Sequence, residues 1–107
     1  MSSIKGVKPE KGTGDKALYF DKCRVFWFTC KSGSTASTYQ LNDSGNNEGD
    51  DVFDVTPPAS GSIHCVFDPP MLLFKGLYVD TDTNVSSWVI GALPGHGEND
   101  QYLEPGP

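Results

Sequence analysis

Cysteine and histidine are the residue types in this chain that could act as a nucleophile, a general base or a soft metal ligand, and both are scarce. The 107 residues include three cysteines and two histidines, which are Cys23, Cys30, Cys65, His64 and His96. Zinc sites use such residues in closely spaced pairs, for example Cys-x-x-Cys or His-x-x-x-His, and no pair of that kind occurs here. Adjacent residues of a strand point to opposite faces, so His64 and Cys65 are poorly placed to share a metal. We therefore expect no metal site and no cofactor.

A nucleophile and its base would have to come from distant parts of the chain. Cys65 with His96 is the one candidate pair for covalent catalysis. His96 lies between Pro94-Gly95 and Gly97, and a segment of this composition is poorly suited to holding a base in position. The motif G-x-S-x-G of serine hydrolases and the motif H-E-x-x-H of zinc proteases do not occur. The sequence therefore predicts neither an enzyme nor a small-molecule substrate.

The pairing of the three cysteines stays open at the level of the sequence. Cys23 and Cys30 are seven residues apart, so in an uninterrupted strand they lie on opposite faces and too far apart to bridge. A turn between them, or Cys65 on a neighbouring strand, would allow one disulfide and leave one free thiol. The simpler interpretation is three small buried thiols in a reducing compartment.

Two acidic segments have the composition of cation-binding loops. Residues 80–84 read Asp-Thr-Asp-Thr-Asn, which is how an EF-hand calcium loop begins. That loop needs glycine at its sixth position and glutamate at its twelfth, where this chain has Val85 and Gly91. Residues 42–51 also gather four acidic side chains. We interpret this segment as a solvated loop, with weak cation binding as the alternative.

The middle of the chain consists of short apolar stretches separated by turn residues. Aromatic and β-branched residues are concentrated in these stretches and favour strands, while no stretch of ten residues has a helical period with caps. The sequence therefore predicts an all-β fold, a small antiparallel β-sandwich or barrel-like domain with extended N- and C-terminal arms. The expected strands cover residues 17–20, 23–30, 37–41, 51–55, 62–67, 77–79 and 85–90.

Composition divides the chain into three expected segments. Residues 1–15 are expected to be a flexible basic arm, residues 16–91 the β-sandwich, and residues 92–107 an irregular acidic tail rich in glycine and proline. No apolar run approaches the length of about 20 residues that spans a bilayer, and no apolar segment follows the N-terminal Met-Ser-Ser. We therefore expect no membrane association and no secretory signal.

Charge is distributed unevenly along the chain. The net charge is −6, yet residues 1–31 hold seven of the eight basic groups and only three of the fourteen acidic ones. An acidic body repels phosphate, so we expect no binding to nucleic acid. The basic N-terminal segment is either a solvated leader or an arm that docks on an acidic neighbour. Its candidate partner contacts are Lys5, Lys8, Lys11 and Lys16.

The chain contains the motif Phe74-Lys75-Gly76-Leu77-Tyr78-Val79 and the segments 34–45 and 51–58. Together, these stretches resemble small virion proteins of tailed bacteriophages. In these segments a turn of small residues leads into a strand that ends in an Asp/Gly loop, and a second short strand leads into another such turn. The resemblance covers residues 17–91. It does not extend to the cysteines or to the proline-rich C-terminal segment.

The resemblance implies a structural role in the virion. Proteins of this kind are made in the cytoplasm of the bacterial host and bind the major capsid protein or other virion proteins. The first expectation is a capsid decoration or cement protein that stabilises the assembled head shell, often as a homotrimer. A tail, connector or fibre component is the alternative within the virion. A carbohydrate-binding β-sandwich that uses Tyr39, Tyr78 or Trp88 as its platform is the alternative from another class.

Overall fold

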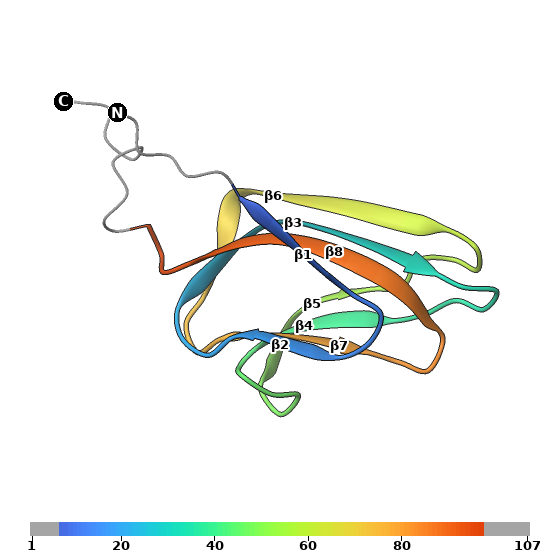
Figure 1. The fold of residues 1–107 in the computed structure, drawn as a ribbon, viewed down its shortest axis with the longest axis horizontal. Coiled ribbons are helices and arrows are strands. Elements are labelled where there is room, and N and C mark those ends of the chain that lie inside the picture. The colour runs from blue at the N-terminus through green and yellow to red at the C-terminus, as the bar shows by residue number, and fades with distance from the viewer. Residues whose placement is uncertain (1–6, 98–107) are drawn as a thin grey trace.

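The computed structural model describes residues 7–97, and within that range the chain is all-β. Eight antiparallel strands form two four-stranded sheets that pack face to face, so the predicted small β-sandwich is confirmed (Figure 1). The described range contains no helix and therefore none that could cross a membrane. The strands are β1 (Lys8–Gly12), β2 (Lys16–Tyr19), β3 (Cys23–Ser32), β4 (Tyr39–Asp43), β5 (Asp50–Val55), β6 (Ser62–Leu73), β7 (Leu77–Thr81) and β8 (Val85–Pro94).

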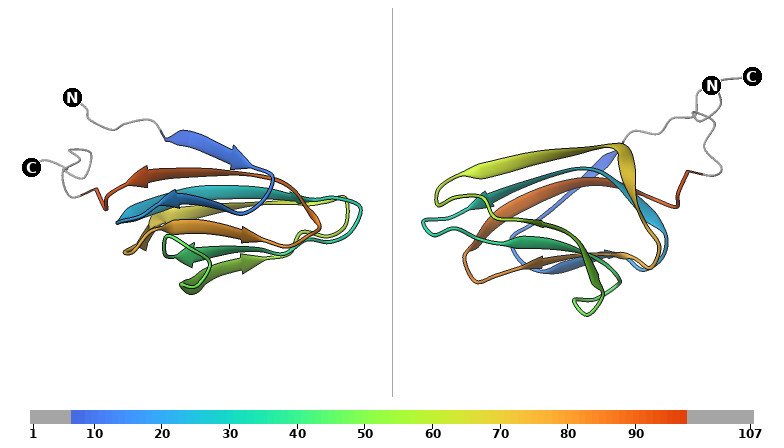
Figure 2. Two further views of the ribbon diagram at one scale, coloured as in Figure 1. Left: turned by 60° about the horizontal axis from the view of Figure 1, so that its bottom comes forward. Right: turned by 180° about the vertical axis from the view of Figure 1, so that it is seen from behind.

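The strand order is that of a jelly roll. Sheet A has the order β1-β8-β3-β6 and sheet B the order β2-β7-β4-β5. The first strand pairs with the last, the second with the seventh, the third with the sixth and the fourth with the fifth, all antiparallel. The chain is thus one long hairpin, closed by the β4–β5 loop and rolled into two layers. Two further views show these layers from other sides (Figure 2).

A bulge in β3 decides which side chains reach the core. The pairing with β8 skips one residue between Val25 and Trp27, so Phe26 is extra in β3. An extra residue reverses the alternation of side chains along a strand. Cys23 and Cys30 are therefore both fully buried on the same side. The placement on opposite faces, expected for an uninterrupted strand, does not apply because the bulge interrupts the alternation of β3.

The N-terminal boundary of the domain lies earlier than predicted. Residues 8–12, which the sequence analysis assigned to a flexible arm, form β1 and pair with β8 at the border of sheet A. Gly12 makes this pairing possible, since a Cβ there would lie 2.4 Å from the indole of Trp88. At the other end β8 continues to Pro94, past the predicted boundary at residue 91. Residues 1–6 and 98–107, the outer parts of the predicted arms, lie outside the described residues.

Strand β6 is also longer than predicted. The Asp68-Pro69-Pro70 sequence was expected to end it at Phe67, whereas β6 runs on to Leu73. Between Val66 and Met71 the pairing with β3 skips several residues, so the prolines lie in a wide bulge. Strand β6 is at the border of sheet A. Proline is tolerated in a border strand because no neighbouring strand needs its missing N–H.

The core between the sheets is built around three aromatic rings. Phe28 and Trp88 come from sheet A and Tyr39 from sheet B, and each is at most 1% exposed. The Phe28 ring meets the Tyr39 ring edge-on at 6.0 Å between centroids and lies 6.4 Å from the Trp88 ring. Burial of such side chains contributes about 1.5–3 kcal/mol each. The smaller core residues around them are Cys23, Val25, Cys30, Leu41, Leu73, Leu77, Val79, Ile90 and Ala92.

The hydroxyl of Tyr39 fastens the two sheets to each other. It donates a hydrogen bond to the carbonyl oxygen of Lys31 in β3. It also accepts one from the backbone N–H of Ser86 in β8, at 3.2 Å. Because Tyr39 itself belongs to β4 of sheet B, one side chain connects the backbones of two sheet A strands to the opposite layer.

Removing this hydroxyl tests its contribution. We expect Tyr39→Phe to lower the free energy of unfolding by about 1–3 kcal/mol, because the Lys31 and Ser86 backbone groups lose a buried partner. The matched control is Tyr78→Phe, whose hydroxyl lies 3.5 Å from Asp15 at the surface and should change stability by less than about 0.5 kcal/mol. Urea unfolding followed by tryptophan fluorescence measures both. Equal losses in the two variants would contradict the role given to Tyr39.

The carboxylate of Asp82 joins two loops at the end of the sandwich opposite the β4–β5 loop. It accepts hydrogen bonds from the Ser37 hydroxyl at 2.7 Å and from the Thr38 backbone N–H at 2.9 Å. The Asn84 N–H adds a third bond at 2.9 Å. These donors favour the ionised form and lower the pKa of Asp82, with the Thr38 bond as the largest cause. The residue that resembled a calcium ligand in the sequence therefore holds the β3–β4 and β7–β8 loops together.

A lowered pKa makes the contribution of Asp82 depend on pH. The stabilisation is complete above the pKa of an unfolded aspartate, about 3.9, and is lost as the pH falls through the lower folded value. We expect Asp82→Asn to melt at a lower temperature than the wild type at pH 7, with the difference shrinking towards about pH 2–3. Melting followed by circular dichroism across this range checks it. A difference that stayed constant with pH would show that the charge is not responsible.

Candidate functional site

The two sheets carry different charges. The strands of sheet A contain four basic and two acidic residues, whereas those of sheet B contain one basic and five acidic residues. On the outer face of sheet B, Asp54 and Asp80 both lie opposite Gln40. Burial, followed by the charges of Asp15 and Asp51, raises the pKa of Asp80. The acidic residues of the strands are thus concentrated in sheet B, and most of the basic ones belong to sheet A.

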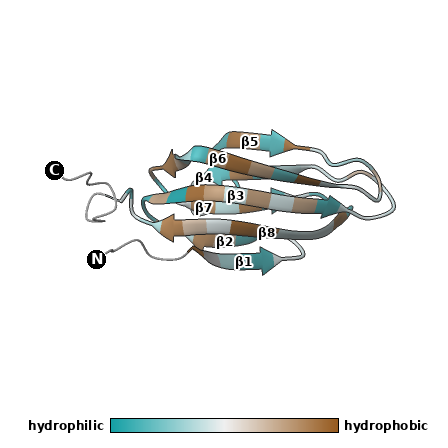
Figure 3. Cartoon of the chain, turned by 90° about the horizontal axis from the view of Figure 1, so that it is seen from above, coloured by the Kyte–Doolittle hydropathy of each residue, from teal (hydrophilic) through white to brown (hydrophobic). Residues whose placement is uncertain are grey.

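The outer face of sheet A carries two rows of side chains that run across its four strands. The strand register places Val66, Trp27, Gly91 and Pro9 in one row, on β6, β3, β8 and β1. Cross-strand neighbours of this kind lie about 4.5–5.5 Å apart at Cβ. Seen from above, apolar residues of both faces, core residues included, mark β6, β3 and β8 of sheet A (Figure 3). The next row consists of His64, Thr29, Val89 and Lys11. We call these eight residues the outer platform.

Trp27 is the largest side chain of the outer platform. It lies over Gly91, where a Cβ would come within 2.3 Å of the indole. Its ring centroid is 6.2 Å from that of His64, whose Nδ1 is hydrogen-bonded to the Thr29 hydroxyl. Val66, its neighbour in the row, is 65% exposed. A partly exposed indole beside an exposed aliphatic residue is typical of a protein contact surface.

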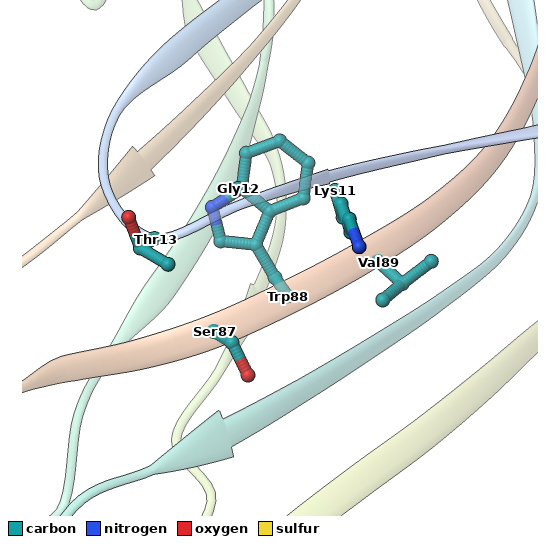
Figure 4. Close-up of a pocket in the computed structure, with 6 residues that line it drawn as sticks. All are labelled: Lys11, Gly12, Thr13, Ser87, Trp88 and Val89. Carbon is teal, nitrogen blue, oxygen red and sulfur yellow. The ribbon is translucent and has the colours of Figure 1, made fainter.

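A shallow hollow of about 550 Å³ adjoins the outer platform at the border between β1 and β8. The indole of Trp88 reaches beneath β1 at Gly12 and donates its N–H to the carbonyl oxygen of Gly14 at 2.9 Å (Figure 4). Lys11 is the one charged residue of the lining. Because the Trp88 bond holds the β1–β2 loop and no acid–base pair lines the hollow, we interpret it as part of the attachment of β1.

A second exposed apolar group lies at the end of the sandwich formed by the β2–β3, β4–β5 and β6–β7 turns. Phe20 is 76% exposed and Phe74 is 59% exposed. The Phe74 ring meets the His96 ring edge-on at 4.6 Å between centroids. The backbone N–H groups of Phe74 and Lys75 are held by the carboxylate of Asp43 at 2.9 and 2.7 Å. Residues 74–76 therefore form a turn that Asp43 holds in place, with the Phe74 ring exposed.

Two of the four lysines predicted to form a docking arm, Lys11 and Lys16, lie in different sheets. Lys11 lies in β1 on the outer platform, whereas Lys16 begins β2 in the other sheet. The Lys16 ammonium is 3.8 Å from the Glu10 carboxylate, with both side chains exposed, so this ion pair contributes little. Lys8 pairs through its backbone with Ala92. Lys5 lies outside the described residues.

The structure gathers no catalytic or metal-binding group from the predicted candidates. Cys23, Cys30 and Cys65 are all free thiols, and among residues 7–97 no three histidine, cysteine or acidic side chains are placed to hold a metal. Burial raises the pKa of Cys23 and of Cys30 to about 12 and also raises that of Cys65. The His96 imidazole bonds to the carbonyl oxygen of Leu73 at 2.6 Å.

Thiols with such pKa values stay protonated at neutral pH and react slowly. We expect that native protein at pH 8 leaves Cys23 and Cys30 unmodified by Ellman's reagent, and that Cys65, which is only partly buried, reacts first. In urea all three should react at once, which is the control for the total thiol count. Rapid reaction of all three in the native protein would contradict the buried placement. Fewer than three reactive thiols in urea would reveal a disulfide.

The platform predicted for a carbohydrate-binding module is not present in the form expected. Tyr39 is fully buried and Trp88 is 1% exposed, so neither ring can stack on a sugar. Tyr78 is partly buried on the outer face of sheet B. The aromatic density of residues 19–28 predicts a core position for Trp27 in preference to a stacking platform, whereas the structure leaves Trp27 partly exposed. The usable signal was the polar Thr29 two residues on, because residues i and i+2 of a strand share a face.

Comparison with known proteins found no relative of the chain. No protein-family model, no curated protein and no solved structure matches the chain. The outer platform, the acidic opposite face and the jelly-roll order are therefore the observations from which a function has to be inferred.

Proposed function

We propose that this chain is a structural protein of a bacteriophage virion, and most simply a decoration protein that binds and stabilises the assembled head shell. The observation that carries the proposal is the two-sidedness of the sandwich. An apolar platform edged by Lys11 occupies sheet A, and a face with several carboxylates occupies sheet B. The jelly-roll order supports it by analogy, because viral capsid proteins use this architecture, although lectins do as well.

In this proposal the outer platform faces the shell and sheet B faces solvent. Trp27 and Val66 supply apolar contact area at the centre of the interface, where aromatic side chains contribute most. Lys11, at the border of the platform, meets an acidic group of the major capsid protein and guides association. The aspartates of sheet B keep the outer surface of the decorated particle charged, which disfavours contacts between particles.

Two other assignments use the same platform. A tail, connector or fibre component would dock through it on a different virion protein and would be present in far fewer copies. A carbohydrate-binding module would stack a sugar ring on Trp27 beside His64, the one partly exposed indole with a polar neighbour among the described residues. The decoration role is preferred because Val66 and Val89 surround that indole with aliphatic surface that a polar sugar leaves unused.

Binding to head shells tests the proposal. The purified chain should co-sediment with expanded shells of the phage that encodes it, in hundreds of copies per particle, and should raise their melting temperature. We expect Trp27→Ala to weaken this binding by tenfold or more, the effect of about 1.4 kcal/mol or more. Phe20→Ala, which removes an exposed ring at the end of the sandwich, is the matched control and should bind normally.

The charge at the platform is tested separately. Lys11→Glu should slow association with shells and reduce its dependence on salt, whereas Lys75→Glu, on the β6–β7 turn, should not. Binding to tails in tens of copies would assign the chain to the tail. Binding to neither shells nor tails would overturn the virion proposal, and quenching of Trp27 fluorescence by sugars would then favour the carbohydrate-binding module.

A further inference from the structure

The border strand β6 leaves a row of backbone groups without a neighbouring strand. In sheet A it pairs with β3 on one side, and no described strand lies on the other. The carbonyl oxygen of Gly61 accepts a hydrogen bond from the N–H of Ser32, so the backbone at residue 61 points towards β3. Backbone groups alternate in direction along an antiparallel strand. The N–H and C=O groups of Ser62, His64 and Val66 therefore point away from β3.

This edge lacks the features with which proteins prevent edge pairing. Exposed edges are normally protected by charged side chains, prolines or covering segments. Three of the four border strands are protected in this way, since β1 contains lysines and a proline, β2 contains Lys16 and β5 contains three aspartates. Residues 62–67 of β6 contain no Lys, Arg, Asp, Glu or proline. The unprotected stretch ends at the prolines of the wide bulge.

We propose that the edge of β6 at residues 62–67 pairs with the same edge of a second copy of this chain. Whatever pairs here must itself present an unpaired strand edge without opposing charge. Among the described border strands only β6 does so, and every copy of the chain carries it. Two identical antiparallel edges related by a two-fold axis satisfy both conditions at once.

The geometry of the edge selects the register of this pairing. Side chains of the outer platform must stay on one face across the junction. Even-numbered residues of one β6 strand therefore lie opposite even-numbered residues of the other. A two-fold axis at His64 meets this condition, with His64 opposite its counterpart and Ser62 opposite Val66 of the second copy. In that register the outward N–H and C=O groups of all three residues find partners. Sheet A becomes a continuous eight-stranded sheet with two outer platforms on one face.

Strand β5 lies close to the same border and opposes the pairing electrostatically. The Phe67 ring of β6 meets the Phe53 ring of β5 edge-on at 5.1 Å between centroids. The aspartates of β5 from the two copies therefore approach each other. Salt screens this repulsion, so the association is measured at about 0.15 M salt and becomes weaker at lower ionic strength.

The mass of the chain in solution and hydrogen exchange test the proposal. Light scattering should give twice the 11.6 kDa of the chain. The amide protons of Ser62, His64 and Val66 should be protected from exchange at concentrations where the dimer forms and should lose that protection on dilution. A monomer up to millimolar concentration would overturn the proposal. So would a trimer, the state implied by the phage-like resemblance, because a two-fold edge pairing closes at two copies.

Two variants at one position separate the backbone from the side chain. Val66→Pro removes an N–H that points away from β3, so the β3–β6 ladder keeps its bonds while the edge is blocked. It should be monomeric with an unchanged circular dichroism spectrum, whereas Val66→Ala should remain a dimer. A dimeric Val66→Pro would contradict this interface. If Val66→Pro does not fold, the exchange measurement on the wild type still decides.

Failure of this inference and failure of the virion proposal are distinguishable. The mass and exchange measurements use the purified chain without shells, and shell binding is measured without reference to oligomeric state. If both hold, a dimer presents two platforms to the shell, and shell binding should strengthen at concentrations where the dimer forms, because two linked contacts provide additional affinity. Trp27→Ala, in contrast, should weaken shell binding and leave the dimer intact.

Discussion

The packing of Tyr39 against Phe28 is the interaction on which the rest of the structure depends. It brings a ring of sheet B edge-on against a ring of sheet A, which in turn lies beside Trp88, and the Tyr39 hydroxyl bonds to the backbones of β3 and β8. A chain of this size buries a limited core, so the relative position of the layers relies on few contacts. Once the layers are fixed, the opposite side of β3 and β8 has to face outward, and that side is the outer platform.

The jelly-roll order turns a linear charge pattern into a two-faced molecule. Of the three strands in the basic N-terminal third, β1 and β3 enter sheet A and β2 enters sheet B. Of the strands in the acidic middle, β4, β5 and β7 enter sheet B and β6 enters sheet A. This separation is what makes a one-sided contact physically reasonable, since one face has apolar area to bury and the other has charge that stays hydrated. The same topology places β6 at a border, where its uncharged edge is available to a second copy.

Much of the fold could be predicted because its signals are local. Alternation within residues 37–41 predicts that Tyr39 and Leu41 share a face, and alternation within residues 85–90 predicts the same for Trp88 and Ile90. All four are buried. The errors arose where the outcome depends on a neighbouring strand. Strand β1 has almost no apolar residues of its own, and it forms because β8 offers backbone partners and Gly12 accommodates Trp88. The two cysteines of β3 share a face because of a bulge that alternation cannot reveal.

Residue types and short-range periods alone predict the all-β class, the positions of most strands and the acidic body. These properties depend on residue type and short-range period, which the chain carries whatever its partners. The tertiary structure decided which aromatic residues are core and which are surface, placing Trp88 inside and Trp27 on the outer platform. It also decided that Lys11 and Lys16, expected in one arm, belong to two sheets. Both outcomes depend on strand pairing between distant segments, and the energy of that pairing is absent from any local stretch of sequence.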